Sequence, residues 1–241
     1  MTASPGEMWD WLRASPLLWL PVTLLAYHVA SWGFLRVGRN PLAIPILGSI
    51  ALIIALLMAT GTPYGTYFEG VQLIHFMIGP ATVAMAIPLY THTERLRKML
   101  IPLTGALLAG SATAVVSAVL IGWACGASRE TLLSLGPKST TMPIAMGITE
   151  KIGGLPSLTS LTVTMTGISG AIMASRLLKL VRVDDPAIRG FAVGLSAHAI
   201  GTAYTLQFGE LAVAFSALGM GLNGVTTALI APVLITLVTG R

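Results

Sequence analysis

Long apolar stretches, separated by short breaks rich in glycine, proline or charge, cover nearly the whole chain. A helix needs about 20 mainly apolar residues to cross the hydrocarbon core of a bilayer. Stretches suited to this lie at about residues 15–35, 42–60, 70–90, 100–125, 156–176, 188–207 and 211–238. The pattern predicts an all-α polytopic membrane protein, with a single transmembrane domain over residues 1–241.

The segment 130–150 is less apolar and is interrupted by Gly136, Pro137, Lys138 and Pro143. It either crosses the membrane as a broken helix or dips in and returns to the same side. Cytoplasmic loops of membrane proteins carry an excess of Lys and Arg. If the segment crosses, six basic residues lie inside and seven outside; if it is re-entrant, ten lie inside and three outside, with Lys138 in neither count. The re-entrant topology fits the rule far better.

An internal repeat accompanies this topology. The sequences GSATAVVSAVLIG (Gly110–Gly122) and GVTTALIAPVLIT (Gly224–Thr236) match with an offset of 114 residues, which predicts repeats at about 15–125 and 130–238. In the first repeat, Pro80 and Pro88 favour a kinked or interrupted helix. The two repeats run in opposite directions across the membrane. Inverted repeats with interrupted helices are typical of secondary transporters, and we expect an elevator-like architecture. A chance match between short apolar segments is the alternative.

Composition narrows the function classes. The chain is 54% hydrophobic and 10% charged, with a net charge of +5 spread over short loops, where it sets orientation; no nucleic-acid partner is expected. One cysteine and four scattered histidines indicate neither a metal site nor a cofactor. All nine acids lie at the ends of spans or in loops, so we expect no enzyme activity. The first residues, with Trp9 and Trp11, do not resemble a removable signal peptide and favour a segment at the membrane interface.

The stretch LSLGPKSTTMPIAMG (Leu133–Gly147) carries the main candidate site. In a re-entrant segment, Lys138, Ser139, Thr140 and Thr141 offer a cation and three hydroxyls at the start of a helix. A helix start also presents free N–H groups and the positive end of the helix dipole. Together they predict a small-anion site. The alternative is that Lys138 reaches the interface and the hydroxyls only cap the helix.

Three further polar residues lie deep in apolar stretches. His198 and Thr202 could face the anion, and His198 could exchange a proton; a histidine held by a neighbouring carbonyl is equally compatible with the sequence. Asn223 is either a third site residue or a link between helices, beside the small-residue face Gly219, Gly221 and Gly224. Hydroxyl residues at 162, 164, 166 and 169 could line a pathway, but we expect them to bond their own helix backbone.

In order along the chain, GPATVAMAIPLY, SLGPKSTTMPIAMGITEKIGG, SLTVTMTGISGA and AHAIGTA resemble the LrgB/CidB family of bacterial membrane proteins, from about Pro41 to Pro232. Members have been described as holin- or antiholin-like regulators of murein hydrolase export and cell lysis. A plant plastid relative resembles a glycolate/glycerate transporter, and bacterial pairs of LrgA-like and LrgB-like subunits have been linked to pyruvate uptake. The resemblance implies a bacterial cytoplasmic (inner) membrane protein, with a separate LrgA-like subunit as a candidate partner.

The sequence therefore predicts a secondary transporter of small monocarboxylates such as pyruvate, glycolate or glycerate. The carboxylate would bind at Lys138, Ser139, Thr140 and Thr141, with His198, Thr202 and Asn223 as further site residues. We expect a homodimer in contact with membrane lipid, with coupling to protons or another ion left open. The alternative function is a holin- or antiholin-like protein that regulates murein hydrolase export and cell lysis.

Overall fold

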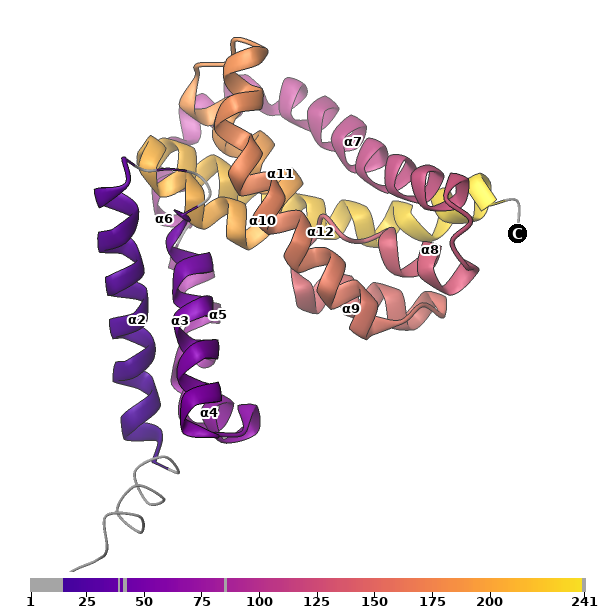
Figure 1. Cartoon of the computed structure of the whole chain (residues 1–241). Coiled ribbons are helices and arrows are strands. Elements are labelled where there is room, and N and C mark those ends of the chain that lie inside the picture. Colours follow the sequence, from indigo (N-terminus) through magenta and orange to yellow (C-terminus); the bar gives the residue numbers. More distant parts are fainter. Residues whose placement is uncertain (1–14, 39, 41–42, 85, 240–241) are drawn as a thin grey trace, which may run out of the picture. The chain divides into compact units, whose positions relative to one another are not determined.

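The computed structural model describes residues 15–38, 40, 43–84 and 86–239, and the predicted interfacial segment with Trp9 and Trp11 lies outside this part. Within it the chain forms helices and no strands, which confirms the predicted all-α class (Figure 1). The chain divides into two compact units, Met1–Ala84 and Met85–Arg241. This division falls at a different place from the boundary expected between the two repeats.

The first unit is built on the antiparallel pair α2 (Pro16–Arg36) and α3 (Pro45–Thr60), followed by the short α4 (Tyr64–Gly70) and by α5 (Gln72–Ala84). Trp19 of α2 is buried against Gly70 of α4. The glycine has no side chain to displace it, since a Cβ there would lie 2.8 Å from the indole. The hydroxyls of Thr23 and Tyr67 also meet, at 3.1 Å. Tight packing therefore fixes α4 against α2.

The predicted interruption of the segment 70–90 by Pro80 and Pro88 stays a prediction, because Met85 lies outside the described residues. On either side of this residue the structure describes α5, up to Ala84, and α6 (Ala86–Thr91). Pro80 lies inside α5, where it cannot donate a backbone hydrogen bond.

The second unit continues from α6 with the long helices α7 (Thr93–Ala124), α10 (Pro156–Leu180) and α12 (Glu210–Thr239). Between α7 and α10 lie α8 (Arg129–Leu135) and α9 (Met142–Ile152); between α10 and α12 lie α11 (Pro186–Thr205) and a short 3-10 turn, η2 (Leu206–Phe208). In the described part of the chain, α2, α7, α10 and α12 are long and apolar enough to cross a membrane. The chain is therefore a multi-pass membrane protein.

The backbones of helices α11 and α12 are in close contact, at a separation that leaves no room for side chains between them. Gly190 and Gly194 form a G-x-x-x-G face on α11, and a Cβ on them would lie only 2.0 Å and 1.9 Å from the carbonyl oxygens of Ala212 and Ser216. Such faces let the backbones of membrane helices come together and gain dispersion energy. The apolar side chains around this contact form a core shared with α7: Leu103, Leu107, Phe191, Leu195 and Phe215.

Candidate functional site

The segment 130–150 folds as a helical hairpin. At a rise of 1.5 Å per residue, α8 and α9 are about 10 Å and 16 Å long, so neither can cross a hydrocarbon core of about 30 Å. Both arms contact the same side chain of α10: the Thr159 hydroxyl donates to the Ser134 carbonyl of α8 (3.1 Å) and meets the Thr149 hydroxyl of α9 (2.8 Å). The two arms therefore lie alongside each other, as a re-entrant segment requires. Residues 136–141 form the tip of this hairpin.

The hairpin tip is buried, because the rest of the second unit covers it. Ser139 is 1% exposed and Thr140 is fully buried, where its hydroxyl donates to the carbonyl of Pro137 (3.0 Å). Gly136 allows the tip to pack closely, since a Cβ there would lie 2.5 Å from the Ile235 side chain of α12. The sequence predicted a membrane-embedded turn for these polar residues. In the structure, other parts of the protein pack over this turn.

Asn223 lies at the centre of a polar network that joins three elements to α12. Its amide nitrogen donates to the carbonyls of Ser139, at the hairpin tip, and Leu195, in α11, both at 3.0 Å. Its amide oxygen accepts from the hydroxyls of Ser111 in α7 (2.7 Å) and Thr227 (3.0 Å). Both N–H groups of the fully buried amide donate a hydrogen bond, and its oxygen accepts two. Asn223 therefore connects helices in addition to lying beside the predicted site.

Helix α11 is broken at His198, whose backbone has φ 42° and ψ −135°. A break of this kind disturbs the backbone hydrogen bonds that would span it. Here side chains donate hydrogen bonds to carbonyls on either side of the break. Asn223 donates to Leu195, and the hydroxyl of Thr202 donates to the carbonyl of His198 (2.9 Å). The same Thr202 hydroxyl meets that of Ser216 on α12, also at 2.9 Å. Asn223 and Thr202 thus support an interrupted helix that the sequence predicted only in general terms.

The imidazole of His198 is buried against α10. Its Nε2 lies 2.9 Å from the carbonyl oxygen of Val163, and since a carbonyl can only accept, the proton of this hydrogen bond is on Nε2. Gly167 makes room for the ring, because a Cβ there would lie 2.6 Å from Cε1 of His198. Of the two alternatives drawn from the sequence, the structure shows the carbonyl contact, and Nδ1 is the ring nitrogen left for other partners.

Lys138 and Thr141 differ from their neighbours at the hairpin tip because both are only partly buried. Within the residues that the structure describes, no acceptor bonds the ammonium of Lys138 and no partner bonds the hydroxyl of Thr141. Thr141 is the N-cap residue of α9 and makes no side-chain capping bond. The tip therefore presents a cation, a hydroxyl and a helix start side by side in sequence.

The structure brings together part of the predicted site and adds residues to it. Ser139 bonds Asn223 directly, and Asn223 and Thr202 both bond the segment around the break at His198. Thr140 and Lys138 share the loop but do not bond this network. Ser111 and Ser216 were missed: both lie in long apolar helices, and the sequence gives no signal that separates Ser111 from Ser117 of the same helix.

The hydroxyl stripe of α10 behaves as expected from the chemistry of threonine in helices. The hydroxyls of Thr162, Thr164 and Ser169 donate to the backbone carbonyls of Thr159, Ser160 and Met165, at 3.0, 2.9 and 2.6 Å. The prediction that the stripe bonds its own helix is confirmed for these three residues and stays a prediction for Thr166.

Comparison with known proteins shows one family. The model described as the LrgB-like family matches residues 23–237. The uncharacterized protein YxaC of Bacillus subtilis is 36% identical over 81% of this chain and 85% of its own length. The antiholin-like proteins LrgB of Bacillus subtilis and Bacillus mycoides are each 30% identical, over 94% and 90% of this chain and 98% and 95% of theirs. No solved structure matches the chain significantly.

Proposed function

Because the chain belongs to the LrgB-like family, we propose that it binds small monocarboxylates at the tip of the re-entrant hairpin and carries them across the membrane. The observation that supports this most directly is the ammonium of Lys138, which has no acceptor within the described residues although its loop neighbours Ser139 and Thr140 are buried. A charged side chain at depth in a membrane is costly and commonly marks a solute pathway.

The groups at the tip suit a carboxylate. One carboxylate oxygen would pair with Lys138 and the other would accept from the Thr141 hydroxyl and from free N–H groups in the first turn of α9. Pyruvate, glycolate and glycerate all provide such a group on a small body. Asn223 has no free donor or acceptor, so its proposed role is to hold the tip in place through Ser139. His198 is the proposed proton-exchanging group, through Nδ1.

The break in α11 and the sequence match between the two halves of the chain support the proposal of an inverted repeat. The break lies at His198, within the second repeat, and the sequences Gly110–Gly122 and Gly224–Thr236 match with an offset of 114 residues. An interrupted helix within such a repeat is typical of the substrate sites of secondary transporters. We propose an elevator-like mechanism, a homodimer and insertion in the bacterial cytoplasmic membrane on this basis.

The test is uptake of labelled pyruvate and glycolate into proteoliposomes. Lys138→Met should abolish saturable uptake, because it removes the cation and keeps the length of the side chain. Lys98→Met is the matched control: this lysine is exposed and bonds Glu94 one helical turn away (2.7 Å). Saturable uptake at the wild-type rate by Lys138→Met, in protein that inserts normally, would reject the proposal.

An antiholin-like function is the second candidate, and the names of the curated relatives favour it more directly than they favour transport. In this function the protein would control membrane permeability and murein hydrolase export, with a separate LrgA-like subunit as partner. It predicts that unrelated dyes pass the membrane without saturation, alone or with the partner, and that Lys138→Met has no effect. Saturation and trans-stimulation by carboxylates would instead support transport.

A further inference from the structure

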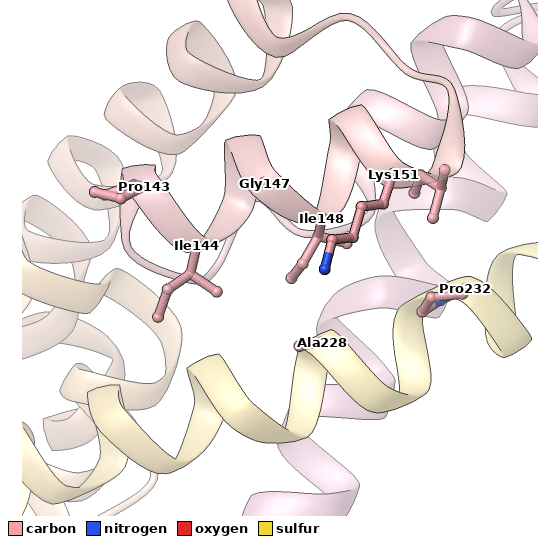
Figure 2. Close-up of a pocket in the computed structure, with 8 residues that line it drawn as sticks. Pro143, Ile144, Gly147, Ile148, Lys151, Ala228 and Pro232 are labelled. Atoms are coloured by element: carbon pink, nitrogen blue, oxygen red, sulfur yellow. The ribbon is translucent and has the colours of Figure 1, made fainter.

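A pocket of about 300 Å³ lies between α9 and α12, on a face of the hairpin whose lining includes none of the residues of the candidate site (Figure 2). Its lining consists of apolar or small residues from both helices and a single charged residue: Pro143, Ile144, Gly147, Ile148, Lys151, Ile152, Ala228 and Pro232. It is therefore a small apolar site with one cation, and nothing proposed above makes use of it.

The pocket extends along most of α9. From Pro143 to Lys151 the helix rises about 12 Å, and Gly147, midway, leaves the space open, since a Cβ there would meet no atom within 4 Å. Ile144 and Ile148 form an apolar wall on the α9 side. On the α12 side, the lining includes the small side chain of Ala228. The space is elongated and apolar, which suits a hydrocarbon chain better than a polar solute.

Lys151 supplies the charge at one end. Its side chain runs back along α9 beside Ile148, with its nitrogen on the side of the helix that faces α12 (Figure 2). The residue is exposed, and no hydrogen bond or ion pair engages its ammonium within the part of the chain that the structure describes. It lies in the last turn of α9, just before the left-handed cap at Gly153, and so at the open end of the hairpin, away from the buried tip.

We propose that this pocket binds the acyl chain of an anionic phospholipid, with Lys151 pairing with the lipid phosphate. A bilayer supplies such molecules at high local concentration, and a basic residue at the mouth of an apolar space between membrane helices selects the anionic ones. A bound chain fills the gap between α9 and α12 and holds the hairpin against the core of the second unit. This site does not depend on the proposed transport function.

Lipid binding by the purified full-length protein in detergent tests the charge. Native mass spectrometry with phosphatidylglycerol and with phosphatidylcholine of the same chains should show tighter binding of phosphatidylglycerol. Lys151→Gln should lose about fivefold in affinity for phosphatidylglycerol, the factor for one lysine at a membrane surface, while Lys151→Arg and the control Lys98→Gln keep it. Inorganic phosphate and glycerol phosphate, which have no acyl chain, should not compete at equal concentration.

A second pair of variants tests the pocket itself. Gly147→Leu should fill the space and weaken binding of both lipids, whereas Gly147→Ala should bind lipid normally, because a methyl group leaves the space largely open. Size-exclusion chromatography and circular dichroism would check that both variants fold. An unchanged preference for phosphatidylglycerol in Lys151→Gln, or unchanged lipid binding in folded Gly147→Leu, would overturn the proposal. The pocket would then be covered by another protein surface and not by lipid.

Discussion

Asn223 shows how one side chain can set the position of several backbones. Its amide nitrogen holds the hairpin tip and the broken helix α11, and its oxygen binds hydroxyls of α7 and α12. A hydrogen bond between membrane helices contributes little on average. A buried carbonyl without a partner, however, costs about 1–3 kcal/mol. Asn223 therefore contributes to stability mainly because it gives two buried carbonyls a hydrogen-bond donor.

Replacing Asn223 by leucine, which has nearly the same shape, should destabilise the protein by about 2 kcal/mol, because the carbonyls of Ser139 and Leu195 lose their donor. The hairpin tip should also become more accessible. Thermal unfolding in detergent measures the first effect, and thiol labelling of Ser139→Cys in a Cys125→Ser background measures the second.

Ser111→Ala is the matched control for this change. It removes one of the two hydroxyls that donate to the amide oxygen, and Thr227 still bonds that oxygen at 3.0 Å. The expected loss of stability is below about 1 kcal/mol. Equal stability of Asn223→Leu and the wild type would show that the carbonyls find other donors.

At the scale of elements, the contact between α11 and α12 depends on glycine. Gly194→Ala should destabilise the second unit by about 3 kcal/mol, because its Cβ would lie 1.9 Å from the carbonyl oxygen of Ser216 and the helices would have to separate. Gly221→Ala on α12 is the control, since a Cβ there meets no atom within 4 Å and alanine favours the helix. Thermal unfolding compares the two; a similar melting temperature for both variants would contradict the prediction.

Element boundaries could be predicted from the sequence because proline and glycine mark them. Pro156 and Pro186 start α10 and α11, and Gly61 and Gly153 end α3 and α9 in left-handed conformations. The hairpin could be predicted because Pro137 and Pro143 interrupt it and the basic residues favour its return. The hydrogen-bonded partners could not, since a contact such as that between Ser111 and Asn223 joins residues 112 apart and leaves no local pattern.

For the whole molecule, the orientation of α10 relative to α7 follows from the hairpin. A re-entrant hairpin leaves the end of α7 and the start of α10 on one side of the membrane, so the loop after α10 lies on the other. The basic residues in and beside that loop, Arg176, Lys179, Arg182 and Arg189, would then face the cytoplasm, as the charge bias favours. A hairpin that crossed would place both loops on the same side.

The native Cys125, exposed at the end of α7, makes this testable. In intact cells an impermeant thiol reagent should label wild-type Cys125, whereas Asp184→Cys in a Cys125→Ser background should react only after the membrane is made permeable. Asp184 is exposed in the loop after α10, so burial does not explain a lack of reaction there. Labelling of both positions in intact cells would contradict the re-entrant topology.

The division of the chain at Ala84 could not have been found from periodicity, because apolar patterning shows which residues enter a membrane and not which helices pack together. The pairing of α11 with α12 through Gly190 and Gly194 is of the same kind. The sequence shows small residues, and only the structure shows which backbone they approach.

The close contact of α11 with α12 also bears on how the ribosome-bound chain enters the membrane. At 20 residues α11 is long enough to span, but it is not among the helices apolar enough to do so alone. Until α12 is synthesised, its glycines and the break at His198 lack this cover and would meet lipid. Stable insertion of α11 therefore has to await the last helix, and a chain truncated before Glu210 should leave this segment at the translocon or return it to the aqueous side.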